Sequence, residues 1–356
     1  MRKVIKVILC ILTVLVVIVA GVLAFATIRE YRPADTEDLT VETASAERIA
    51  SAGSSEELTV LTWNIGYGCL GDNADFFMDG GKGVNTADKE RLDRNLSQAV
   101  SVLEAQNADL ILLQEIDHNS SRSHHTDETA LLAQAFPGYD HTFANNFKTD
   151  FVPYPIPPIG KVDSGVMTLS ALPINQAERI SLPCPFSWPV RTVNLKRCLA
   201  IHHIPVGNDG CELVLVNLHL EAYDDGEGKI AQTQMLSKII QEERDAGNYV
   251  IAGGDFNQTF SSCDISAYPA QEGKWAPGLI DESTLQEGWQ FLMDNQNPSC
   301  RSLDQPYAGA DQESFQYYVI DGFIVSDNIE VLSFQALDEG FVCSDHNPVL
   351  MKIRLI

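Results

Sequence analysis

Polar side chains that could hold a metal ion or move a proton lie at the ends of several short apolar runs of the sequence. Carboxylate and amide oxygens are the ligands that Mg²⁺ prefers, and histidine accepts a proton near neutral pH. Taken singly, such a residue is usually a turn residue or a hydrogen-bonded structural group. Six such positions in one chain indicate a metal site with an acid–base group beside it. They hold Asn64, Glu115, His219, Asp255 with Asn257, Asp321, and Asp345 with His346.

The apolar runs predict the strands that must position these groups. They are short and rich in Val, Ile and Leu, which favours β-strands, whereas residues 87–106 and 229–246 carry apolar side chains at helical spacing. Many strands, few helices and no regular alternation of the two predict two packed sheets flanked by helices rather than a doubly wound parallel sheet. The predicted strands cover residues 58–63, 109–114, 165–170, 198–204, 213–220, 249–252, 318–325, 329–336 and 348–353.

Six short motifs occur along the chain in the order TWN, QE, NLHL, GDFN, DGF and SDHNP. In this order they closely resemble the endonuclease/exonuclease/phosphatase superfamily, which includes pancreatic deoxyribonuclease, abasic-site endonucleases, neutral sphingomyelinases and inositol polyphosphate 5-phosphatases. The resemblance covers residues 58–356. It implies an α/β fold, a four-layer α/β sandwich of two packed, mainly antiparallel β-sheets flanked by helices, and a hydrolase that acts on a phosphoester.

The resemblance also implies a divalent metal ion, Mg²⁺ or Mn²⁺. Glu115 matches the principal metal ligand, Asn64 matches the ligand beside it, and Asp345 matches a further acidic residue near the metal. A metal ion held there would contact a phosphate oxygen and offset the charge that develops in the transition state.

Five further residues take catalytic roles from the resemblance. His346 matches the catalytic histidine and Asp321 the carboxylate that pairs with it, an arrangement that orients the imidazole and fixes its tautomer. Asp255 and Asn257 match the pair that orients the nucleophile and the phosphate. His219 matches a second histidine, which contacts the phosphate. On the sequence alone, the proton of the attacking water could pass to His346 or to Asp255.

Two arginines are predicted to bind the substrate phosphate. Arg197 lies where the nuclease and sphingomyelinase branches place a phosphate-contacting basic residue, although it matches by position only. Arg122 follows Glu115 closely enough to reach the same rim, where its planar guanidinium group would suit a phosphate. A solvated loop arginine is the other interpretation of Arg122.

The net charge limits the class of substrate. The 356-residue chain has 24 Lys and Arg against 49 Asp and Glu, a formal charge of −25. Residues 1–32 contain five of the basic residues and one acidic residue, so the remainder carries −29. Because non-specific binding of nucleic acid depends on Lys and Arg that neutralise phosphates, this balance disfavours a DNA or RNA partner, though not a small catalytic cleft.

The N-terminus predicts export. Residues 7–26 are apolar and uncharged and follow three basic residues. About 20 apolar residues suit a membrane span, and the preceding positive charges would keep the N-terminus in the cytoplasm, leaving a single-pass protein with an extracytoplasmic body. A cleaved signal peptide is the competing interpretation, because the sequence Ala24-Phe25-Ala26 has the small-x-small form of a cleavage site. The protein would then be secreted.

Three parts are expected along the chain: a membrane segment at 1–32, a flexible linker at 33–57, which is rich in Ala, Ser, Thr and Glu, and a catalytic domain at 58–356. The eight cysteines contain no CxxC pair, which argues against a zinc site. Their pairing stays open.

Together these observations predict an exported, membrane-tethered, metal-dependent phosphoesterase, with a lipid headgroup or a small phosphoester as the favoured substrate. One alternative is an extracellular DNase-like endonuclease, which the charge disfavours. A binding module without activity is another, disfavoured because every expected polar position is present. Residues 147–161, where four prolines lie beside Phe151 and Tyr154, are either a membrane or substrate contact or a rigid surface loop.

Overall fold

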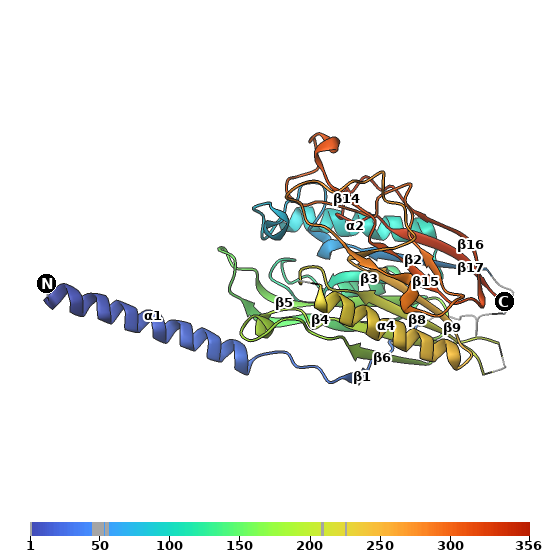
Figure 1. Ribbon diagram of the computed structural model, residues 1–356, viewed down its shortest axis with the longest axis horizontal. Helices are drawn as coiled ribbons and strands as arrows, with labels where there is room; N and C mark the ends of the chain where they lie inside the picture. Colours follow the sequence, from blue (N-terminus) through green and yellow to red (C-terminus); the bar gives the residue numbers. More distant parts are fainter. Residues whose placement is uncertain (1, 45–52, 54–56, 208–209, 225) are drawn as a thin grey trace.

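The computed structural model describes residues 2–44, 53, 57–207, 210–224 and 226–356. It shows two β-sheets packed face to face, with helices on their outer sides (Figure 1). This confirms the predicted four-layer α/β sandwich.

The first sheet has six strands in the order β16-β17-β2-β3-β5-β4. Neighbouring strands run antiparallel except β2 and β3, which are parallel. Its strands are β2 (Glu57–Asn64), β3 (Leu110–Asp117), β4 (Asp140–Val152), β5 (Gly160–Ser170), β16 (Ile329–Ala336) and β17 (Val349–Leu355).

The second sheet has seven strands in the order β1-β6-β7-β8-β9-β15-β12, with β8 and β9 parallel. Its strands are β1 (Thr36–Asp38), β6 (Gln176–Ser181), β7 (Cys198–Pro205), β8 (Glu212–His219), β9 (Tyr249–Asp255), β12 (Gln290–Leu292) and β15 (Asp321–Val325). Two small sheets pair β10 (Gln258–Phe260) with β11 (Gly278–Ile280), and β13 (Cys300–Arg301) with β14 (Tyr317–Tyr318).

Helices cover the outer faces of both sheets. Helix α2 begins after Asp88, whose side chain accepts a hydrogen bond from the Arg91 amide, and it ends at Asn107 in the left-handed conformation; both residues are common helix caps. The α-helices are α1 (Arg2–Ile28), α2 (Lys89–Gln106), α3 (Glu128–Ala135) and α4 (Glu227–Asp245). Short 3₁₀ turns are η1 (Gly66–Gly68), η2 (Phe77–Asp79), η3 (Val190–Val193), η4 (Glu282–Thr284) and η5 (Gln312–Ser314).

Alternation along β3 shows how the layers form. Ile111 and Leu113 belong to the core under α2, while Leu110 and Leu112 face the second sheet. Strand β8 divides its side chains in the same way between the centre of the sandwich and α4. Because both faces of these strands are buried, their sequences are continuous apolar runs.

A buried amide joins the two sheets. Asn217 of β8 donates hydrogen bonds to the carbonyl of Met167 (3.0 Å) and the hydroxyl of Thr168 (3.1 Å) on β5, and accepts one from the Gln114 side chain (2.9 Å) on β3. All four side chains are fully buried. Because an unpaired amide is costly in such a place, these bonds favour one relative position of the sheets.

Some elements differ from the sequence prediction. Strands β4 and β6 and helix α3 were not predicted, since none of them is a simple apolar run. β4 buries alternate positions that include Asp140, Thr142 and Asn146, so its sequence is largely polar. Much of the expected loop at 147–161 therefore belongs to the β4–β5 hairpin, and its connection is confined to 153–159.

Part of the expected linker lies against the second sheet. β1 pairs antiparallel with β6, and Glu42 forms an isolated bridge with His141. Backbone pairing with a sheet edge, rather than an apolar pattern, orders this stretch, and so no sequence pattern indicated it. Residues 45–52 and 54–56 of the expected linker lie outside the described residues.

Helix α1 projects from the sandwich (Figure 1). It is long and apolar enough to cross a membrane, and none of its residues is buried. A signal sequence passes the same test. The eight cysteines, one of them in this helix, are free thiols.

We expect the Asn217→Leu variant to lose about 1–3 kcal/mol of unfolding free energy, because leucine fills the space but leaves buried polar partners unpaired. The measurement is urea unfolding of the full chain in detergent. Asn175→Leu, at an exposed position just before β6, is the control and should change stability little. Equal stability of the two variants would show that the Asn217 bonds do not hold the sheets together.

Candidate active site

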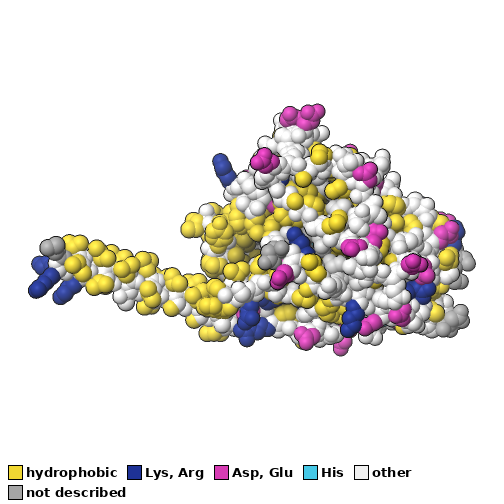
Figure 2. All heavy atoms as spheres, in the orientation of Figure 1, with side chains coloured by type: hydrophobic (Ala, Val, Ile, Leu, Met, Phe, Trp, Pro, Cys, Tyr) yellow, Lys and Arg dark blue, Asp and Glu magenta, His cyan; other side chains and the backbone are white. Residues whose placement is uncertain are grey.

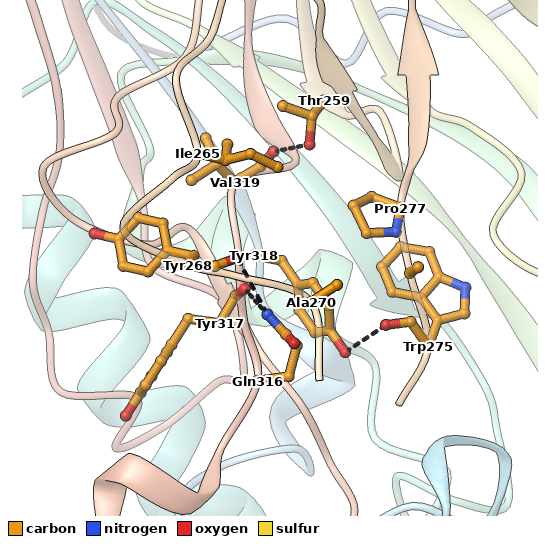
Figure 3. A pocket seen from close by; sticks show the side chains of 11 residues that line it. Thr259, Ile265, Tyr268, Ala270, Trp275, Pro277, Gln316, Tyr317, Tyr318 and Val319 are labelled. Carbon is orange, nitrogen blue, oxygen red and sulfur yellow. Dashed lines mark hydrogen bonds between the residues drawn. The ribbon is translucent and has the colours of Figure 1, made fainter. Parts of the chain in front are cut away.

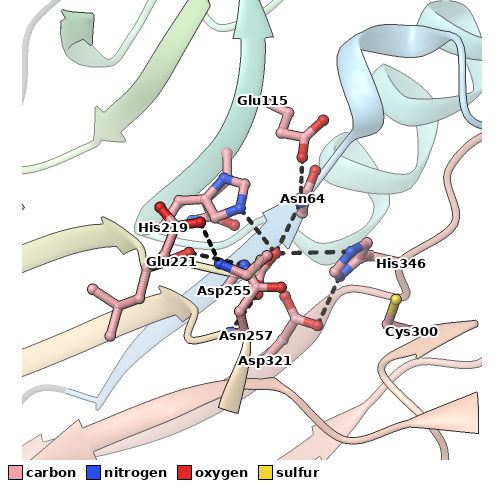
Figure 4. Close-up of polar contacts among 12 residues, drawn as sticks. Asn64, Glu115, His219, Glu221, Asp255, Asn257, Cys300, Asp321 and His346 are labelled. Atoms are coloured by element: carbon pink, nitrogen blue, oxygen red, sulfur yellow. Dashed lines mark hydrogen bonds and ion pairs between the residues drawn. The ribbon is translucent and has the colours of Figure 1, made fainter. Parts of the chain in front are cut away.

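The predicted site residues converge at one end of the sandwich. Strand register accounts for three of them, because His219 is paired with Asp255 and Asp255 with Asp321 on the adjacent strands β8, β9 and β15. Asn64 ends β2 of the facing sheet, and His346 lies in the loop before β17. Figure 4 shows these side chains directed toward one another.

Asp255 lies at the centre of the cluster. One carboxylate oxygen, Oδ2, accepts a hydrogen bond from the Asn64 amide at 3.0 Å, and lies 3.4 Å from Nε2 of His219 and 3.8 Å from Nε2 of His346. The other oxygen accepts the backbone N–H of Asn257 at 2.9 Å. The Asn64 contact thus connects the first sheet to the second inside the site.

His346 and Asp321 form a buried pair. Nδ1 of His346 lies 2.8 Å from Oδ2 of Asp321. The loop is held by its backbone, because the His346 carbonyl accepts the indole N–H of Trp63 at 2.9 Å and its amide donates to the Ser344 hydroxyl at 3.1 Å. Burial, the largest single influence, lowers the pKa of His346, but the charge and hydrogen bond of Asp321 together with the nearby Cys300 and Asp345 outweigh it, so the net pKa lies well above 6.5.

A break in the regular pairing of β3 aims Glu115 out of the sheet. The register between β3 and β5 shifts between Leu113 and Ile116, and Glu115 has a φ of 55°, in the left-handed region. Bulges of this kind redirect a side chain. The Glu115 carboxylate lines the cavity and accepts a hydrogen bond from Asn64 at 3.3 Å.

The carboxylates here repel one another. Burial, followed by the charge of Asp321, raises the pKa of Asp255 to about 7. Burial also raises the pKa of Asp345 to about 6, with the positive charge of His346 opposing it and Glu115 adding to it. A cation near Glu115 and Asp345 would offset this excess negative charge, and the hard oxygen donors of both suit Mg²⁺ or Mn²⁺.

Cys300 also reaches this cluster, and the sequence did not indicate it. Its sulfur lies within 4.8 Å of ligand atoms of Asp345 and His346. Burial raises the pKa of the thiol to about 12, so it stays protonated at neutral pH. Because metal-ligating cysteines are thiolates, oxygen ligands remain the better donors here.

Both predicted arginines line the cavity, and both are already paired. Arg197 is buried, 3.3 Å from Glu221, and donates to the His219 carbonyl at 3.1 Å. Arg122 forms two hydrogen bonds with Asp117 and lies 3.6 Å above the ring of Tyr67. Arg122 is therefore not a solvated loop residue; Asp117 fixes its guanidinium group beside the cavity.

The site opens into a cavity of about 770 Å³. The lining residues that the sequence analysis missed include Tyr67, Asp79, Glu221 and Tyr223. Glu221 lies two positions after the predicted site residue His219, and this closeness in sequence could have indicated that it belongs to the site. Tyr223 donates to Asp79 at 3.1 Å, and burial raises the pKa of Asp79 to about 7. This contact depends on tertiary structure, because 144 positions separate the two residues.

A much smaller cavity of about 40 Å³ lies near Trp275 and Tyr318, which also line the large one (Figure 3). The Tyr318 hydroxyl donates to the Trp275 carbonyl at 3.0 Å. None of the residues that line it is a carboxylate or a histidine. Of these two cavities, only the large one is therefore lined by acid–base groups.

The matching family model is that of the endonuclease/exonuclease/phosphatase family, over residues 61–346. The chain belongs to this family, whose members hydrolyse phosphoesters and generally depend on a divalent metal ion. A search of curated proteins finds no match.

Solved structures share the fold. An endonuclease/exonuclease/phosphatase from Beutenbergia cavernae is 18% identical with a TM-score of 0.56, over 84% of this chain and 72% of that one. A family protein from Bacteroides vulgatus is 16% identical with a TM-score of 0.53, over 85% and 100%. The human Nocturnin catalytic domain, solved with a bound sulfate anion, is 15% identical with a TM-score of 0.51, over 84% and 94%.

If Asp321 acts by orienting His346, Asp321→Asn and His346→Ala should each slow hydrolysis by about 10²–10⁴-fold. The double variant should be little slower than the worse single one, because residues that act as a unit are not additive. The measurement is the initial rate on bis(p-nitrophenyl) phosphate. Asp327→Asn, at an exposed position beyond β15, is the control. Multiplicative losses would show that the two groups act independently.

Proposed function

We propose that this chain is an exported, membrane-tethered, metal-dependent phosphoesterase that cleaves its substrate by in-line attack of water. The observation that carries the proposal is the convergence of the His346–Asp321 pair, Asp255 and Glu115 at one cavity. A family fold without activity would not need to keep three ionisable groups buried beside the half-buried Glu115, since burying charge is costly.

Glu115 and Asp345 are the groups that would hold the metal ion, with Asn64 beside them. The fit rests on their oxygen donors and on the raised pKa of Asp345, which reflects burial and, in part, the charge of Glu115. When bound, the ion supplies positive charge to a phosphate oxygen and offsets the transition-state charge.

Asp255 is the better candidate for the general base. Its pKa of about 7 lets it accept a proton from water near neutral pH. His346, whose pKa lies well above 6.5, is then an imidazolium that donates a hydrogen bond to the phosphate and stabilises its charge. The structure therefore favours Asp255 where the sequence left two possible bases.

His219 and Asn257 would orient the phosphate. Burial, followed by the charge of Arg197, lowers the pKa of His219 well below 6.5, so the ring is neutral. Among the described residues no partner satisfies its buried Nδ1. Asn257 is held by its side-chain bond to the Leu220 carbonyl at 2.9 Å. Arg197 and Arg122 add fixed positive charge to the wall of the cavity.

The favoured substrate is a lipid headgroup or another small phosphoester. The body is strongly acidic, whereas a groove for DNA depends on a track of Lys and Arg. Tethering beside a bilayer also raises the local concentration of membrane-resident substrates. Both arguments disfavour the DNase-like alternative.

Metal removal tests the mechanism. EDTA should abolish hydrolysis of bis(p-nitrophenyl) phosphate, and Glu115→Ala should abolish both hydrolysis and Mg²⁺ binding by calorimetry, because the variant lacks the main anionic ligand. Glu104→Ala, on the exposed face of α2, is the matched control and should keep both. Full turnover in EDTA would exclude the proposed mechanism.

Substrate preference tests the second part of the proposal. At equal concentrations of full-length enzyme, we expect hydrolysis of phospholipid in mixed vesicles to exceed nicking of supercoiled plasmid, because the acidic body repels a polyanion. Phosphate or headgroup release and gel electrophoresis measure the two rates. Efficient nicking with no lipid hydrolysed would replace this proposal with a nuclease.

A further inference from the structure

An apolar surface surrounds the end of the body from which α1 projects. Its side chains come from three segments, and the Phe77 ring packs against the Tyr154 ring with centroids 5.8 Å apart, which joins two of the segments. They are between 45% and 94% exposed, and Ile156 is the most exposed. We name this surface the apolar rim; it consists of Met78, Phe151, Tyr154, Ile156, Trp188 and Val190.

The apolar rim is continuous with α1. The Trp188 indole donates to the Thr27 hydroxyl at 3.1 Å, and Arg29 contacts Asp150 of β4 at 2.5 Å. Figure 2 shows hydrophobic side chains running from the helix onto the adjoining part of the body. The apolar rim therefore lies at the level where α1 leaves the body, not on a remote face.

Basic side chains outnumber acidic ones around Glu30, close to where α1 leaves the body, although the chain as a whole is acidic. Arg32, Arg191 and Lys196 all contact one carboxylate, that of Glu30, at 2.9, 3.4 and 3.4 Å. Lys and Arg beside tryptophan and tyrosine are typical of the boundary between a bilayer and water. This charge is complementary to lipid phosphates.

The same segments form a wall of the large cavity. Phe77, Tyr154, Phe186, Val190 and Leu195 line it together with the catalytic groups. The cavity is thus lined both by polar groups such as Glu115 and His346 and by residues of the apolar rim, including Tyr154 and Val190.

We infer that the apolar rim docks on the outer surface of the bilayer that α1 spans and holds the mouth of the cavity against it. The site then takes a phosphoester whose phosphate reaches His346 and His219 while its apolar part lies along the wall beside Tyr154. This inference rests on the proposed function for the chemistry at the phosphate. The contact with the bilayer stands on the geometry of α1 and the rim.

Fluorescence quenching tests the contact. The full chain is placed in phosphatidylcholine nanodiscs with lipids brominated on the acyl chain, in a Trp188→Phe background. Ile156→Trp should be quenched, whereas Leu332→Trp, on β16 at the opposite end of the body (Figure 1), should not. Equal quenching of the two reporters, or none, would overturn the inference.

Activity provides a separate test. Ile156→Asp should slow hydrolysis of vesicle phospholipid about tenfold, the effect of losing one buried aliphatic contact. It should leave hydrolysis of bis(p-nitrophenyl) phosphate unchanged, and Leu332→Asp should alter neither. Equal loss on both substrates, or on neither, would contradict docking. A wild-type chain that hydrolyses neither substrate refutes the proposed function, while the quenching result still decides the membrane contact.

Discussion

The hydrogen bond from Asn64 to Asp255 joins the two sheets at the point where the chemistry is proposed. It forms only if β2 and β9 face each other in one position, and the buried bonds of Asn217 favour that position from the middle of the sandwich. Because both contacts are buried, breaking either one costs free energy: it would leave an amide or carboxylate unpaired away from water. The site thus depends on how the sheets pack as well as on how each strand folds.

Packing also explains the electrostatics of the site. Neighbouring strands bring Asp255 and Asp321 side by side, and burial strengthens their repulsion. His346 offsets part of this negative charge, and a metal ion beside Glu115 would offset more. A cluster of this kind binds cations and raises carboxylate pKa values toward neutrality, which are the properties that water activation requires.

The proposed orientation on the membrane follows from the first element of the chain. Thr27 of α1 contacts Trp188, and Arg29, directly after the helix, contacts Asp150 of the β4–β5 hairpin. The hairpin and the segment around Trp188 also border the cavity. The exposed side chains of Tyr154 and Ile156, costly in water, become favourable where the helix meets a bilayer. In the proposed orientation, α1, the apolar rim and the large cavity together place the site against the lipid.

The sequence alone determined the strands with both faces buried, the layered α/β class and the residues at the strand ends, because apolar runs and short polar motifs are local signals. It missed β4, whose buried side chains include Asp140 and Asn146, and β1, which depends on backbone pairing with β6. Only the tertiary structure paired Arg122 with Asp117, brought Cys300 and Tyr223 to the site, and raised the pKa of Asp255, on which its proposed role as the base rests. These outcomes depend on burial and on contacts between distant segments, which no local pattern encodes.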